Sequence, residues 1–207
     1  MTASLVATGS TIRLVGAGES LTTIRLSDNN ANFQTGTSGY LLRTGEALQN
    51  GQENAGFANY ISNLTLDVGA GNPAAIGCRY SVANNGSMRN VTIRSSDATK
   101  RGLHGLMFGT SAGSGYVSDV TIDGFDNGIH SEGNNVNDIV FVDVTLTNQR
   151  VRAVNHTAKC LVFENLSISG TPRGIDVTDI NAMLMVDGLT MTGPGSGTSF
   201  GGPTRPR

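Results

Sequence analysis

The sequence predicts an all-β fold, a right-handed parallel β-helix, and three observations carry this prediction. A short strand motif with two apolar positions separated by Thr or Ser recurs six times, at 63–66, 90–93, 119–122, 143–146, 165–168 and 188–191. Its copies lie 22 to 29 residues apart. The chain also has 28 glycines and no tryptophan. A strand motif with this period is typical of a solenoid, in which each coil buries its apolar face on its neighbours.

Aligned on this motif, three columns of residues are apolar in every copy, which predicts ladders of side chains stacked inside the helix. In a strand, alternate side chains point to the same face, so these columns define the inward positions. The columns are Ile61, Met88, Val117, Phe141, Phe163 and Val186; Leu64, Val91, Val120, Val144, Leu166 and Leu189; and Leu66, Ile93, Ile122, Leu146, Ile168 and Met191.

A second strand follows in each coil, marked by a small residue before an aliphatic one. The pairs are 75–76, 105–106, 128–129, 153–154 and 174–175. A small residue suits a sharp bend, where a larger side chain would crowd the backbone. A third, less regular strand at 139–141, 161–163 and 184–186 completes a coil of three strands. Insertions at 67–74, 94–104 and 109–116 are expected to wall a groove. A leucine-rich solenoid lacks support because its consensus is missing, and a β-sandwich does not explain columns of fixed period.

One β-helix domain is expected over residues 1–192. Two strands at 11–14 and 23–26 open it, with Ile12, Leu14, Ile24 and Leu26 pointing inward. Residues 28–58 lose the pattern and are predicted to form a long loop. Residues 193–207 are rich in Gly, Pro and Ser and are expected to be disordered. Cys78 and Cys160 lie three coils apart, beyond the reach of a disulfide, so two free and largely buried thiols are predicted.

Composition excludes some classes of partner. Only 14% of residues are charged, the formal net charge is -2, and no basic run is present, so nucleic acid is not an expected partner. No stretch approaches the roughly 18 apolar residues of a membrane helix, so a membrane is not expected either. The N-terminus lacks the pattern of a secretion signal.

Three stretches resemble the pectate-lyase-like superfamily of bacterial proteins, specifically the rhamnogalacturonase/epimerase-type and glycoside hydrolase family 55-like domains. They are 16–18 with 23–28, 59–73 (NYISNLTLDVGAGNP) and 120–129 (VTIDGFDNGI). The resemblance covers about residues 11–192. It implies a right-handed β-helix that acts on carbohydrate. Relatives carry a further glycine-rich coil before this region and continue beyond it, so the chain is expected to be a fragment. The NTD, DD and GHG signatures of polygalacturonases and the RxPxxR signature of classical pectate lyases are absent, and no catalytic residue is carried over.

Polar residues from adjacent coils converge on one predicted face, just around the second strands. Directly after the aliphatic residue of each second strand, the outward column contains Gly77, Met107, His130, Asn155 and Asp176. Two positions before the same aliphatic residue, a second column contains Ala74, His104, Asn127, Arg152 and Arg173. Arg152 and Arg173 are hypothesised to bind sugar carboxylates, since guanidinium geometry suits them, and Asn155 is a further candidate for substrate binding. His130 or Asp176 is the candidate for proton transfer. The alternative is that these residues only pair with one another, Arg173 with Asp176 for example.

Carboxylates offer a second candidate site. Asp123 and Asp126 flank a turn beside Glu132 and Asp143, and β-helix hydrolases cleave glycosidic bonds with paired carboxyl groups. Tight turns favour Asp and Asn in any case. Calcium is the only cofactor that these carboxylate oxygens suggest, although the sequence contains no recognisable calcium-binding loop. A zinc site is not expected, because the three histidines are scattered along the sequence. The column Asn63, Asn90, Asp119, Asp143 and Asn165 is interpreted as structural, at a corner of the coil.

Two functions follow from these observations. The first is a carbohydrate-active protein that binds an extended polysaccharide along the groove and cleaves it as a lyase or glycoside hydrolase. The second is a non-catalytic β-helix with a carbohydrate-binding, adhesive or phage-tailspike role. A monomer is expected for the first and a trimer for a tailspike. The resemblance implies an extracellular or cell-surface location.

Overall fold

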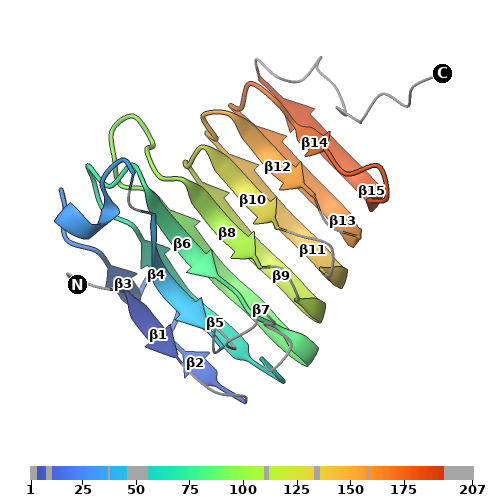
Figure 1. The fold of residues 1–207 in the computed structure, drawn as a ribbon, viewed down its shortest axis with the longest axis horizontal. Helices are drawn as coiled ribbons and strands as arrows, with labels where there is room; N and C mark the ends of the chain where they lie inside the picture. Colours follow the sequence, from blue (N-terminus) through green and yellow to red (C-terminus); the bar gives the residue numbers. More distant parts are fainter. Residues whose placement is uncertain are drawn as a thin grey trace.

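A computed structural model describes residues 4–7, 11–36, 38–45, 56–109, 112–132, 136–157 and 159–193. In these residues the chain forms a parallel β-helix, as the repeat predicted. Two sheets make up its walls, and every strand pairing within them is parallel. Successive coils run side by side from the N-terminal to the C-terminal end of the molecule (Figure 1).

The first sheet, called sheet A, has seven strands in the spatial order β1-β4-β6-β8-β10-β12-β14. Their bounds are β1 Leu5–Ala7, β4 Gly39–Thr44, β6 Ala75–Arg79, β8 His104–Phe108, β10 Asn127–Ser131, β12 Arg152–His156 and β14 Ile175–Val177. These are the predicted second strands, one to a coil, preceded by β1 and β4.

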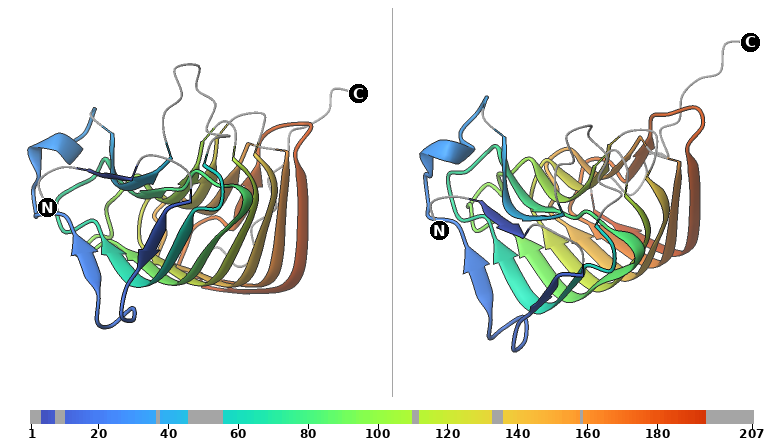
Figure 2. Two further views of the ribbon diagram at one scale, coloured as in Figure 1. Left: turned by 90° about the horizontal axis from the view of Figure 1, so that it is seen from below. Right: turned by 60° about the horizontal axis from the view of Figure 1, so that its bottom comes forward.

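The second sheet, called sheet B, has eight strands, with β3 lying off its main path and paired to β5. Their bounds are β2 Arg13–Val15, β3 Thr23–Arg25, β5 Tyr60–Asp67, β7 Ala83–Arg94, β9 Gly113–Asp123, β11 Asn137–Thr147, β13 Cys160–Ser169 and β15 Met183–Thr192. Figure 2 shows sheets A and B as opposite walls of a flattened tube. The only helical element described is a short 3-10 turn, η1 Ala31–Phe33.

The strands predicted on either side of the Asn/Asp column are continuous in the structure. Each long strand of sheet B contains both predicted strands, and it bends at the residue of the Asn/Asp column. Asn63, Asn90, Asp119, Asp143 and Asn165 adopt φ of 51° to 58°, and Gly188 adopts 72°. This left-handed conformation is tolerated best by Gly, Asn and Asp, which explains the residue types of the column. The amides also bond along it: Asn90 Nδ2 donates to Asn63 Oδ1 at 3.1 Å, and Asn165 Nδ2 donates to Asp143 Oδ1 at 3.1 Å.

The inward ladders form the core as predicted. Fifteen of the eighteen ladder residues are buried, and the three in β15 (Val186, Leu189 and Met191) pack against the core while partly exposed. Phe141 and Phe163 stack with ring centroids 4.4 Å apart. Cys78 and Cys160 are both free thiols, as expected; Cys78 is buried and Cys160 is half-buried.

Two predictions about the N-terminal coils were wrong. Residues 39–44, placed in the long loop 28–58, form strand β4, which pairs with β1 and β6 and buries Leu41 and Leu42. The alignment of β6 was also shifted by two residues, because Cys78 rather than Ile76 pairs with Leu106. The small residue at the bend of this coil is therefore Gly77 and not Ala75, and the outward residue beside Met107 is Arg79 and not Gly77.

Other expectations lie partly outside the described residues. β15 spans Met183–Thr192, and 194–207 of the predicted disordered tail lie outside the described residues. Of the insertion predicted at 109–116, the part from Gly113 onward is the start of β9. Within the described chain, no helix has the length and apolar character needed to cross a membrane.

Candidate site on the outer face of sheet A

The predicted cluster of polar residues forms on the outer face of sheet A. In the register of the sheet, His130 lies beside Asn155, and Asn155 beside Asp176. A second column places His104 beside Asn127 and Asn127 beside Arg152. Residues three positions apart in a regular strand face opposite sides. Both columns nevertheless point outward, because the strand bends at Gly105 and at the equivalent position of each neighbouring coil. A Cβ on Gly105 would lie 2.3 Å from Ile122 Cγ2, so this position faces the core.

Two histidines lie at the centre of the cluster. The rings of His104 and His130 stack with centroids 4.3 Å apart and an interplanar angle of 22°. Asn127 Nδ2 lies 3.1 Å from His104 Nδ1, and Asn155 Nδ2 lies 3.0 Å from His130 Nδ1. Burial is the main reason that the pKa of each histidine is lowered; the pKa of His104 falls to about 3. Both imidazoles are therefore neutral at pH 7.

The orientation of Asn155 decides which nitrogen of His130 carries the proton. Arg152 Nη1 donates to Asn155 Oδ1 at 3.4 Å, which leaves Asn155 Nδ2 directed at His130. The lone pair of His130 Nδ1 accepts from this amide, so the ring proton lies on Nε2. In this arrangement His130 offers an N–H donor, whereas a general base would need a free lone pair.

Asp176 joins two arginines. Arg152 Nη1 and Arg173 Nη1 each lie 3.0 Å from Asp176 Oδ2. The Asp176 side chain is 9% exposed and that of Arg173 is 57% exposed, so one guanidinium reaches into solvent. The expected alternative, in which Arg173 pairs with Asp176, is thus present. Arg152 Nε and Asn127 Oδ1 are buried and have no hydrogen-bond partner among the described residues.

The column of His130 continues toward the N-terminal coils with further arginines. Met107 of β8, Arg79 of β6 and Arg43 of β4 follow in register. Tyr40 lies under both guanidiniums, 5.3 Å from Arg79 Cζ and 5.9 Å from Arg43 Cζ, and its hydroxyl accepts from Arg79 Nη1 at 2.7 Å. The outer face of sheet A thus presents polar or cationic side chains in successive coils, with Met107 between its two halves.

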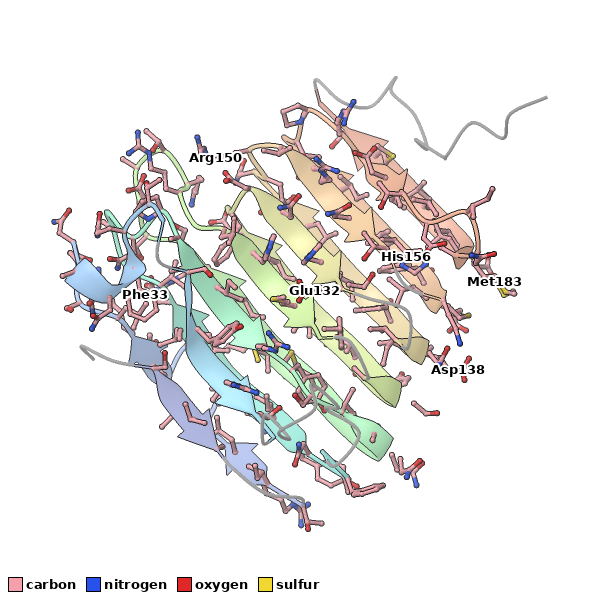
Figure 3. All side chains as sticks on the ribbon, in the orientation of Figure 1. Phe33, Glu132, Asp138, Arg150, His156 and Met183 are labelled. Atoms are coloured by element: carbon pink, nitrogen blue, oxygen red, sulfur yellow. The ribbon has the colours of Figure 1, made fainter. Side chains whose placement is uncertain are left out.

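The four carboxylates of the second candidate site do not gather. Asp126 precedes the five-residue strand β10 and Glu132 follows it, which separates them by roughly 17–20 Å at the rise of a strand. Figure 3 shows Arg150, the partner of Asp126, near one end of the sheet A strands and Glu132 near the other. Asp143 lies at the bend of β11. Asp123 is bound by Lys100 Nζ at 2.5 Å, Asn148 Nδ2 at 2.7 Å and Thr147 Oγ1 at 3.3 Å.

Asp126 lines a surface groove of about 570 Å³ at the corner between the two sheets. Pro73, Ala74, Arg101 and Leu103 line it too, so the predicted insertions at 67–74 and 94–104 do wall a groove. Arg150 Nη1 lies 2.6 Å from Asp126 Oδ1. Burial raises the pKa of Asp126, although Arg150 acts in the opposite direction. Across the described ranges, no group of three or more His, Cys, Asp or Glu side chains is arranged to hold a metal ion.

A buried serine and histidine lie at the far end of the same strands. Ser131 Oγ is 3.0 Å from His156 Nδ1, and His156 Nε2 is 3.0 Å from the carbonyl oxygen of Met183. Both residues are fully buried, which identifies the pair as a structural link between coils. His156 is labelled in Figure 3 at the end of β12.

A comparison with family models decides the classification. The model for rhamnogalacturonase A/epimerase, pectate lyase-like proteins matches residues 2–176. The chain belongs to this family. No curated protein and no solved structure gives a significant match. Family membership and the β-helix together indicate a carbohydrate-related function, in agreement with the resemblance seen in the sequence.

Sequence reasoning identified most of this cluster but not its internal order. His104 and Asn127 were not among the converging residues, although the structure places both within it. The sequence pattern could have predicted their place in the cluster, because His104 and Asn127 occupy the same column as Arg152. Arg43 and Arg79 were missed because β4 was not predicted and β6 was aligned two residues away.

Proposed function

We propose that this protein binds an extended acidic polysaccharide along the outer face of sheet A. The observation that carries the proposal is one register column that contains Arg79, Met107, His130, Asn155 and Asp176, with the guanidinium of Arg173 bound to Asp176 at its end. Adjacent strands are about 4.8 Å apart, a spacing comparable to the length of a sugar unit in an extended chain. Guanidinium groups suit sugar carboxylates, and neutral imidazole N–H groups and amides suit hydroxyls.

Within this proposal the arginines and histidines have different roles. The exposed guanidinium of Arg173 binds a carboxylate of the polysaccharide, while Asp176 holds both Arg152 and Arg173 in place. His130 donates from Nε2, because its Nδ1 accepts from Asn155. Binding is favoured over cleavage because Asp176 Oδ2 is engaged by two guanidiniums and the Nδ1 atom of each histidine faces a side-chain amide.

A binding measurement tests the proposal. Polygalacturonate and alginate are compared with neutral β-1,3-glucan by isothermal titration calorimetry. We expect binding of the acidic polymers only, and we expect Arg173→Ala to abolish one binding step of the titration, or to weaken that step at least tenfold, while the protein stays folded. Thr145→Ala, on the opposite wall of the helix, is the matched control and should bind normally. Equal binding of the neutral glucan, or a titration in which Arg173→Ala changes no binding step, would overturn the proposal.

Cleavage is a second candidate function, and the groove with Asp126 favours it. A carboxyl group whose pKa is raised by burial is suited to protonate a glycosidic oxygen, and Arg101 and Arg150 line the same groove. Hydrolysis would release reducing ends, whereas β-elimination would produce unsaturated uronides that absorb ultraviolet light. We propose incubating the folded chain with the same polymers and following both signals. Release of reducing ends that is lost in Asp126→Asn would support this candidate, and the absence of both signals would reject it.

A further inference from the structure

The outer face of sheet B carries a second group of aromatic and cationic side chains, away from the site on sheet A. Tyr60 of β5, Ser87 of β7 and Tyr116 of β9 lie in one register column. The two tyrosines are therefore two strands apart, which is about 10 Å at the usual strand spacing. Ser87 between them is small and leaves the space between the rings open.

Each tyrosine has an arginine over its ring. Arg13 Cζ lies 5.5 Å from the centroid of Tyr60, and Arg89 Cζ lies 4.9 Å from that of Tyr116. Arg13 is on β2 and Arg89 on β7, so arginine and tyrosine alternate on the four successive strands β2, β5, β7 and β9. Stacking on a ring holds a guanidinium in place without neutralising its charge. Neither arginine forms an ion pair with any described residue.

All of these residues except Arg13 line a shallow groove. It has a volume of about 440 Å³, and its lining includes Tyr60, Ser87, Arg89, Tyr116 and Asp138. The lining holds one arginine, Arg89, and one carboxylate, Asp138, and Arg13 lies beside the groove over the ring of Tyr60, so the surface as a whole carries an excess of positive charge and favours an anionic ligand. Asp138 is exposed and suits hydroxyl groups as a hydrogen-bond acceptor. The ligand must therefore combine negative charges, hydroxyl groups and an apolar face, and it must be extended in the direction of the helix axis.

We propose that this surface is a second binding site for an acidic polysaccharide, which crosses β2, β5, β7 and β9 with uronate carboxylates on Arg13 and Arg89 and sugar rings against Tyr60 and Tyr116. The site faces away from sheet A, because the two sheets form opposite walls (Figure 2). One chain can thus engage two polysaccharide strands. This inference does not rest on the function proposed for sheet A, since no residue is shared.

Tyrosine fluorescence tests this site directly, because the chain has no tryptophan and four tyrosines. Of these, Tyr80 is fully buried and Tyr40 is on sheet A. The probes are oligogalacturonides of defined length and the same oligomers with methyl-esterified carboxyl groups. We expect the charged oligomers to change the emission, and the esters to bind at least tenfold more weakly. Tyr116→Ala and Arg89→Ala should each weaken binding at least tenfold.

Two controls separate this site from sheet A and from a loss of folding. Val162→Ala changes the same column two strands beyond Tyr116 and should leave binding unchanged. Tyr40→Phe and Arg173→Ala affect only sheet A and should leave the fluorescence response in place. The proposal is overturned if the esters bind as well as the charged oligomers, if Tyr40→Phe abolishes the response, or if no response occurs with the folded protein.

Discussion

At the scale of single residues, the inward and outward positions of a ladder strand differ sharply in what they tolerate. Val120 and Ile122 of β9 are buried within the core, while Thr121 between them points outward and is half-buried. Val120→Asp or Ile122→Asp would bury an unpaired charge and should lower the free energy of unfolding by at least about 3 kcal/mol. Thr121→Asp should cost less than about 1 kcal/mol. Urea unfolding compares the three variants, and similar losses at all three would contradict the assignment of faces.

The histidine pair makes stability depend on pH. The pKa of His104 is lowered to about 3, first by burial and then by the nearby His130, whereas an unfolded histidine titrates near 6.5. Above pH 6.5 both states are neutral and His104 adds no pH dependence. Below pH 6.5 the unfolded chain takes up the proton first, so stability is lost as the pH falls from about 6.5 toward 3.

Replacing His104 should therefore flatten this part of the stability curve. At pH 4.5 the folded protein should lose about 2–3 kcal/mol relative to pH 7 through His104, and His104→Gln should lack that loss. Urea unfolding at the two pH values measures it. Thr145→Ala keeps His104 and should show the same pH dependence as the unchanged chain. An equal loss in His104→Gln would show that other groups cause the effect.

At the scale of the strand, the bend at the start of the sheet A strands needs a small residue. A Cβ at Gly105 would lie 2.3 Å from Ile122 Cγ2 and 2.7 Å from the carbonyl oxygen of Gly128. Gly105→Ala should therefore destabilise the protein by about 1–3 kcal/mol, because both atoms belong to packed neighbouring strands. The equivalent position in β12 already holds Ala153, so Ala153→Gly should cost only about 0.5–1 kcal/mol. Thermal unfolding distinguishes them, and a harmless Gly105→Ala would contradict the close packing of this bend.

The strands also show what the sequence could and could not predict. The ladders were predictable because the same apolar columns recur in six coils, and a repeated pattern fixes its own register. Strand β6 was misaligned because Ala75-Ile76 and Gly77-Cys78 both fit a small residue followed by an apolar one. Strand β4 was missed because Leu41 and Leu42 are adjacent and show no alternation. The His104–His130 stack depends on side-chain rotamers across two coils, for which a column of residue types carries no information.

At the scale of the whole molecule, the β-helix should be held together mainly by contacts between neighbouring coils, so its stability should vary along its axis. β9 pairs on one side with β7 and on the other with β11, and its ladder residues are buried. β15 pairs with β13 alone in the described sheet, and its inward residues Leu184, Val186 and Leu189 are only partly buried. Met183, labelled in Figure 3, is 56% exposed.

β15 is therefore expected to open locally without unfolding of the central coils. Native-state hydrogen exchange at neutral pH should show its amides exchanging at least tenfold faster than those of β9, since local opening of β15 breaks one strand pairing and opening of β9 breaks two. Low concentrations of urea should accelerate exchange in β9 more than in β15, because only the larger opening exposes much new surface. Equal protection of both strands, with the same response to urea, would mean that the solenoid unfolds as one cooperative unit.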